Sequence, residues 1–229
     1  MVKGALIEFS ASLLLPTPNL IVFQYNPETL GRSLAPWAPP AKEDREHPDD
    51  KLLNQLKQPY DPQETFTLQL ELDAADSLES IATNPGASIY GIADRLSALE
   101  MLMYPEVITP VNGLNVPTDA SLQGGPSLGV KIISQTRVPV VLFSWGPGRI
   151  VPVRVESFSI EEQAFLPTLY PMRAKVNLGM KVLDKSAFFA NDESRPVKLA
   201  KACYDYTIAQ KKALAAVNTA NSVEVLLPF

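Results

Sequence analysis

The side chains of this chain that could do chemistry are few and lie far apart. The single histidine, His47, sits among acidic residues at 43–50, and the single cysteine, Cys203, follows more than 150 residues later. A metal site needs ligands at fixed spacing on a rigid frame, and a segment rich in proline and charge supplies no such frame. We therefore interpret His47 as a solvated loop residue and Cys203 as a small apolar residue on a helix.

Two other segments are weak candidates for catalysis. Glu161 and Glu162 are adjacent, and adjacent residues of a strand point to opposite faces, so a turn or capping role is favoured over a pair of catalytic carboxylates. The sequence GGPSLG, starting at Gly124, is not followed by the lysine and hydroxyl residue that a phosphate loop has at the required spacing. The same segment contains a Gly-x-Ser-x-Gly match, Gly125 to Gly129, but the strand-to-helix setting that a nucleophilic serine needs does not surround it, and zinc-ligand spacing is absent. We therefore expect a non-enzymatic protein without a metal or other cofactor.

Composition and charge narrow the range of partners. The chain has 229 residues with 25 acidic and 20 basic side chains, for a net charge of −5, so it has no basic footprint for nucleic acid. Its apolar runs are far shorter than the ~20 residues that span a bilayer, and Glu8 interrupts the segment where a signal peptide would be apolar. We expect cytoplasmic assembly without direct membrane insertion.

The elements that must position any site are mainly strands. Residues 172–182 alternate strictly between apolar and polar, as in a strand with one buried and one wet face. Arg173, Lys175 and Lys181 lie on the wet face, which must meet water, a neighbouring subunit or an acidic cargo. The same alternation predicts a strand at 65–73 and a hairpin formed by residues 3–10 and 21–25.

Other patterns predict a β-bulge, helices and loops. Within 150–160 the apolar residues change parity after Val155, as a β-bulge requires. Apolar spacing of three and four residues predicts a helix over 89–104, and composition predicts another over 196–217. Two stretches, 33–64 and 105–136, show neither period and are expected to be long loops. The predicted organisation is therefore a β domain over 1–184 and a helical extension over 185–229.

Three segments together resemble a known protein family. FQYNPETLGRS, VLFSWG and PVRVESFSIEEQAFLPTLYPMRAKVNLGMKVL occur in the order and spacing of the tube-domain proteins of contractile injection systems, which are phage-tail-like particles. These relatives are often called LysM-type baseplate or tube-adaptor proteins. The resemblance covers residues 3–184. The motif residues that we expect to be structural are Asn26, Pro27, Trp145, Phe165 and Pro171.

The resemblance implies a fold and a role. It implies a β-barrel or sandwich with a flanking helix, six copies of which form a ring whose sheets join into one lumen wall. It also implies partners: an inner tube protein, a spike or hub protein and other baseplate components. On this interpretation Arg173, Lys175 and Lys181 line the channel or a ring interface; ordinary solvent exposure is the alternative. Residues after 185 lack a LysM signature, so glycan binding is not carried over.

Two alternative functions remain. A glycan-acting enzyme would need acidic residues that converge in space, with Glu161 and Glu162 as the first to test. A monomeric carbohydrate-binding β domain would need exposed aromatic platforms, for which Trp37 is the strong candidate. The ring adaptor remains the leading hypothesis because alternating strands with open edges favour pairing with another copy.

Overall fold

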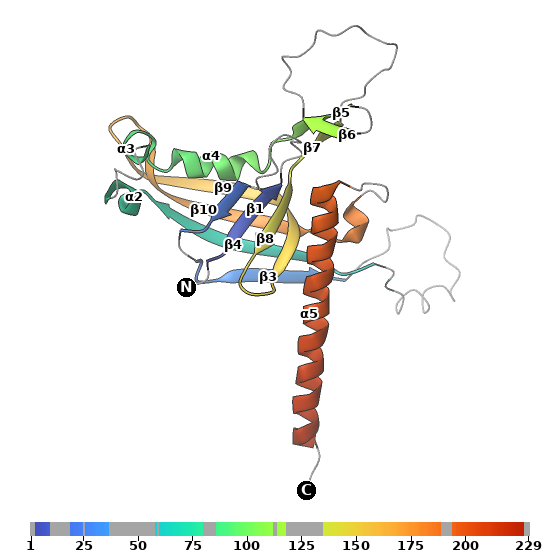
Figure 1. Cartoon of the computed structure of the whole chain (residues 1–229). Coiled ribbons are helices and arrows are strands. Elements are labelled where there is room, and N and C mark those ends of the chain that lie inside the picture. Colours follow the sequence, from blue (N-terminus) through green and yellow to red (C-terminus); the bar gives the residue numbers. More distant parts are fainter. Residues whose placement is uncertain are drawn as a thin grey trace, which may run out of the picture.

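The structure, a computed structural model, is built around one large antiparallel β-sheet (Figure 1). It describes residues 3–9, 19–24, 26–36, 58, 60–79, 86–111, 114–117, 135–188 and 194–226. The seven strands run in the spatial order β2-β1-β8-β9-β10-β4-β3. Their bounds are β1 Ala5–Phe9, β2 Asn19–Val22, β3 Leu30–Ala35, β4 Gln63–Asp73, β8 Val140–Ser144, β9 Ile150–Phe165 and β10 Pro171–Val182. A mainly β fold, as the alternation predicts, is confirmed.

The sheet curls around its core but does not close. Phe66 on β4 packs edge to face on Phe143 on β8, with ring centroids 5.3 Å apart, although β9 and β10 lie between these strands in the sheet order. The apolar residues of β4 and β10 all face this core. Strands β2 and β3 remain as the two edges, each paired with a described strand on one side only.

Helices cover the core from two sides. The α-helices are α2 Ala75–Glu79, α3 Ala87–Tyr90, α4 Ala93–Met101 and α5 Arg195–Leu226, and a 3-10 helix, η1, spans Lys185–Ala187. Helix α4 buries Leu96 and Leu99 in the core, while α5 packs against β9 and β8 and contributes Tyr204. The helix predicted over 89–104 is interrupted, because Gly91 adopts a φ of 58° between α3 and α4.

The predicted β-bulge in β9 is confirmed. The register of β9 against β10 shifts between Gly179 and Met180, where Gly179 pairs with Ser157 and Met180 pairs with Val155. The turn role expected for Glu161 and Glu162 is wrong. Strand β9 continues to Phe165, because β10 supplies partners along its whole length, and the two glutamates lie within the strand.

Both predicted loops contain strands. The second half of strand β3 lies in the 33–64 stretch; its sequence, LGRSLA, has little intrinsic strand preference and is extended by pairing with β4. A second, three-stranded sheet in the order β6-β5-β7 occupies part of 105–136, with β5 Glu106–Val111, β6 Leu114–Pro117 and β7 Gln135–Arg137. Pro110 and Pro117 obscured this pattern, although the dipeptide between Val111 and Leu114, Asn-Gly, is a hairpin signal.

Candidate functional site

The outer face of the sheet carries rows of polar side chains that cross β4, β10 and β9. One row joins Thr67, Gly179 and Ser157, and the next joins Gln69, Asn177 and Ser159. Within the second row, the Asn177 amide donates a 3.4 Å hydrogen bond to the Ser159 hydroxyl. These small uncharged residues line a shallow groove of about 550 Å³. The centre of this face is therefore polar but uncharged.

The three basic residues predicted on this face lie in different surroundings. Arg173 is paired with Asp73, its Nη2 donating to Oδ2 at 2.6 Å. Lys175 lies directly between Glu71 on β4 and Glu161 on β9. Lys181 lies beside Arg154. Carboxylates therefore lie beside Arg173 and Lys175, whereas Lys181 lies beside another cation. The face thus carries charges of both signs, and only the row at Lys181 is basic.

The other predicted motif residues lie in structural positions. Trp145 stacks on Phe143 with ring centroids 6.2 Å apart and packs against the core. The Asn26 side chain accepts a 2.9 Å hydrogen bond from the Gly4 N–H, with Pro27 next in the chain. Phe165 and Pro171 pair with each other where β9 ends and β10 begins. These contacts order the β1–β2 hairpin and the β9–β10 hairpin.

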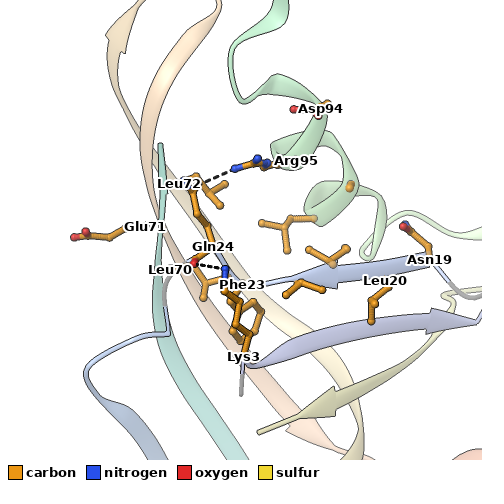
Figure 2. A pocket seen from close by; sticks show the side chains of 14 residues that line it. Lys3, Asn19, Leu20, Phe23, Gln24, Leu70, Glu71, Leu72, Asp94 and Arg95 are labelled. Atoms are coloured by element: carbon orange, nitrogen blue, oxygen red, sulfur yellow. Dashed lines mark hydrogen bonds between the residues drawn. The ribbon is translucent and has the colours of Figure 1, made fainter. Parts of the chain in front are cut away.

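A second groove, which we call the slit, separates edge strand β2 from β4 (Figure 2). It has a volume of about 510 Å³ and is lined by residues of β2, β4 and α4, together with Lys3 and the Phe23–Gln24 segment. At one end Gln24 bridges its walls, because its Oε1 accepts from the Asp73 N–H at 3.0 Å and from Arg95 Nη1 at 2.8 Å. The slit is the place where the sheet fails to close.

The wall of the slit formed by β4 carries backbone groups without a described strand partner. Strand β3 pairs with β4 only from Gln63 to Leu68, so the rest of β4 is paired by β10 alone. The Ala74 N–H donates to the Met172 carbonyl on the β10 side, while the Asp73 N–H donates to Gln24 on the other side. Since strand amides alternate in direction, the amide of Glu71, which lines the slit, points away from β10.

The backbone amides of the opposite wall, β2, alternate in direction in the same way. The Phe23 N–H donates to the Gly4 carbonyl on the β1 side, so the amides of Leu20 and Val22 point away from β1. The side chains of Leu20 and Val22 are 56% and 47% exposed, and β2 contains no charged residue. Both walls of the slit thus present backbone donors and acceptors.

Helix α5 is fastened to the sheet by polar contacts. Its Thr207 hydroxyl donates to the Ile150 carbonyl at 2.7 Å, and its Tyr204 hydroxyl donates to Asp61 at 2.8 Å. Lys211 donates to the buried carboxylate of Glu64 at 2.6 Å, which also accepts from Arg32. Burial, followed by the Asp61 hydrogen bond, raises the pKa of Tyr204. From residue 212 onward the described side chains of α5 are exposed, and this half extends away from the sheet (Figure 1).

The candidate catalytic residues do not come together. Glu161 lies in register with Lys175 and Glu162 with Ala174, so these two carboxylates point to opposite faces. Cys203 is half-buried on α5, and burial raises the pKa of its thiol. His47, Trp37 and the GGPSLG segment lie outside the described residues. Within the described part of the chain, no group of three or more His, Cys, Asp or Glu could hold a metal ion.

Comparisons with known proteins supply no family for this chain. No protein-family model matches it, and no curated protein is similar to it. Among the helices in the described ranges, none combines the length and the apolar content needed to cross a membrane.

The slit was not predicted from the sequence, because Gln24, Leu72 and Arg95 are far apart in the chain and carry no shared motif.

Proposed function

We propose that this chain is a structural subunit, not an enzyme, that assembles into a ring through the edges of its sheet. The observation that carries the proposal is the open seven-stranded sheet, whose edge strands β2 and β3 differ from each other. A contact between two different edges is heterologous, and copies related by rotation can close such contacts into a ring. The resemblance to tube-domain proteins makes six the expected number of copies.

The composition of the edges supports pairing with another copy. Natural edge strands are usually protected by charges, proline or bulges. Here β2 carries no charge, and the one charged residue of β3, Arg32, is engaged with Glu64. Leu34 on β3 is half exposed. In the register with β4, the amides of Leu30, Arg32 and Leu34 alternate away from the ladder and are available to a second strand.

The proposed ring is an adaptor within a contractile injection particle. It would join the inner tube to the spike or hub, template tube polymerisation and transmit force when the sheath contracts. The polar, uncharged centre of the outer face supports a role as channel wall, because a passing cargo would meet few fixed charges there. An obligate ring of this kind needs interfaces of about 2,000 Å² or more each.

Templating of the inner tube tests this role. We expect purified chain to bind both the inner tube protein and the spike protein, and to shorten the lag of tube polymerisation. The Leu34→Pro variant removes one free-edge amide without breaking the β3–β4 ladder, and we expect it to lose templating. Leu34→Ala, which keeps the amide, is the matched control. The proposal would be contradicted by a chain that binds neither the inner tube protein nor the spike protein. It would also be contradicted by a Leu34→Pro variant that shortens the lag of tube polymerisation as the wild type does.

A further inference from the structure

The tip of the β9–β10 hairpin, together with α3, carries a cluster of exposed apolar side chains. We call this cluster the tip patch, and its members are Ile89, Tyr90, Phe165, Leu169 and Tyr170. Leu169 is 80% exposed, and the other four are about half exposed. The two segments that supply them, 86–92 and 164–172, contain no charged residue. Aromatic enrichment without charge is typical of the core of a protein–protein interface, whereas a surface that binds anionic lipid carries Lys or Arg.

The tip patch is held in one arrangement by contacts between the hairpin and α3. The rings of Tyr90 and Tyr170 pack edge to face with their centroids 5.4 Å apart. The Ile92 N–H donates to the Pro171 carbonyl at 3.0 Å, and within the turn the Leu166 N–H donates to the Tyr170 carbonyl at 2.9 Å. The patch is therefore preformed, and a partner does not have to order it on binding.

Leu169 occupies a turn position that favours glycine. Its φ is 64°, in the left-handed region, and its N–H donates to the Leu166 carbonyl at 2.8 Å. Hairpin turns usually have Gly in this conformation, because a side chain is strained there. A leucine that is both strained and 80% exposed contributes little to the fold. Its side chain is better explained by a contact with another molecule.

The position of the tip patch determines what can cover it. Strand β9 begins beside α5, where the Ile150 carbonyl accepts from Thr207, and its 16 residues end at the tip. The hairpin tip and α3 thus lie at the end of the sheet opposite to α5 (Figure 1). Copies that pair through β2 and β3 lie side by side, so the strand ends face the two ends of the ring. A molecule stacked on one end of the ring would therefore cover the tip patch, whereas a neighbour within the ring would not.

The area of the tip patch indicates a multivalent contact. Large aromatic side chains bury about 150–250 Å² each, so five large apolar side chains that are about half exposed offer about 500 Å². A stable complex needs about 800 Å² from each partner. One patch is too small for such a complex, whereas six patches in a ring offer about 3,000 Å² and act together.

We infer that the tip patch binds the inner tube protein, with one tube subunit seated on each copy of the ring through an uncharged apolar pocket. This inference rests on the proposed ring. A template must hold the first tube subunits in fixed positions, so its contact sites must be rigid and must repeat once per copy. The tip patch meets both conditions, since it is preformed and lies at the end of every copy. The pocket receives Leu169, with the rings of Tyr90 and Tyr170 beside it.

A glycine at position 169 tests the contact without damage to the turn. Glycine relieves the strain at a φ of 64°, so we expect Leu169→Gly to form the ring with a thermal midpoint close to that of the wild type. Its affinity for immobilised segments of the inner tube should fall at least about 30-fold, as expected for the loss of a hot spot. The matched control is Leu214→Ser, which removes an exposed leucine from α5 and should bind tube segments as the wild type does.

Two further variants test the extent and the valency of the tip patch. Ile89 lies on α3, and its carbonyl accepts from the Thr168 hydroxyl at 3.5 Å. We expect Ile89→Ser to weaken tube binding about tenfold or more, with ring formation unchanged. The Leu34→Pro monomer keeps the tip patch but has one copy of it, so it should bind tube segments at least about 100-fold more weakly than the ring. Equal binding by monomer and ring would contradict the multivalent contact.

The outcomes separate this inference from the proposed function. A Leu169→Gly ring that binds tube segments with wild-type affinity would overturn the inference and leave the proposed function standing. The same holds if Leu169→Gly loses binding to the spike protein instead, if it loses binding of the wild type to phosphatidylcholine vesicles, or if the wild type assembles as twelve copies with its tips in contact. A wild-type chain that forms no ring would overturn both.

Discussion

At the scale of single residues, the ionised carboxylate of Asp73 organises the end of β4. Its Oδ1 accepts from the Ala75 N–H at 2.8 Å and its Oδ2 from Arg173, while its own N–H donates to Gln24 across the slit. The Ala75 hydrogen bond and the Arg173 charge lower the pKa of Asp73, with partial burial acting in the opposite direction. The folded state therefore favours the ionised form.

This lowered pKa predicts a pH dependence of stability. A carboxyl whose pKa is lower in the folded than in the unfolded state contributes stability above the unfolded pKa of about 4, and that contribution is lost as pH falls through the folded pKa. Between pH 4 and pH 2 we expect urea midpoints of the wild type to fall more steeply than those of Asp73→Asn. Arg173→Gln should keep part of the wild-type slope, because the Ala75 hydrogen bond, the largest single cause, remains. Parallel curves for wild type and Asp73→Asn would contradict this account.

The buried carboxylate of Glu64 predicts a stability effect. Its side chain is 7% exposed and contacts two cations, Arg32 and Lys211, which are about two-fifths exposed. Removal of the charge leaves these cations to rehydrate, so we expect Glu64→Gln to lower the free energy of unfolding by about 1–2 kcal/mol, measured by urea unfolding. Glu71→Gln, on the exposed outer face, should change it by less than about 0.5 kcal/mol. Equal changes in the free energy of unfolding for the two substitutions would contradict a stabilising role of the buried Glu64 carboxylate.

At the scale of elements, one glycine decides how α3 and α4 meet the start of β10. Gly91 has a φ of 58°, and a Cβ there would strike the Pro171 carbonyl oxygen, which is backbone and cannot move aside. The same carbonyl accepts the Ile92 N–H at 3.0 Å. The hairpin of β9 and β10 and the helical segment are therefore joined at one backbone contact that requires glycine.

This contact gives a matched pair of glycine substitutions. We expect Gly91→Ala to lower the thermal midpoint and to destabilise the fold by about 1–3 kcal/mol, because strain and a backbone clash add. Gly86 lies just before α3 with a φ of −67° and has room for a methyl group, so Gly86→Ala should be neutral or slightly stabilising. A Gly91→Ala variant as stable as Gly86→Ala would show that this junction is not constrained.

The described side chains in the far half of α5 are exposed. The helix is about 48 Å long at 1.5 Å per residue, and Leu214 and Val217 are 68% and 56% exposed. We expect deletion of residues 213–229 to leave the thermal midpoint within about 2 °C, since little apolar area is lost from the core. A fall of 10 °C or more, measured by differential scanning calorimetry, would mean that this half supports the sheet.

The elements that could be predicted are those with a strong local signal. Alternation over 65–73 and 172–182 identified β4 and β10, and the parity change after Val155 identified the bulge. Strand β3 was missed because LGRSLA becomes extended only through its pairing with β4. The slit could not be predicted, since it depends on a hydrogen bond between Gln24 and Asp73 that no local pattern encodes.

At the scale of the whole molecule, the sheet is curled and incomplete. Its core is covered by α4 and α5, yet β2, β3 and the end of β4 keep backbone groups that no described strand satisfies. A long-lived soluble sheet normally protects such edges. Assembly with sister copies would satisfy the same groups, and this is the physical basis of the proposed ring.

The native mass of the purified chain tests this central claim most directly. A closed ring predicts a single species at six times the 25.0 kDa chain mass, present without intermediate sizes at micromolar concentration. We expect Leu34→Pro to run as a folded monomer and Leu34→Ala to match the wild type. A wild-type chain that stays monomeric at every concentration, alone and with tube and spike proteins, would contradict the account.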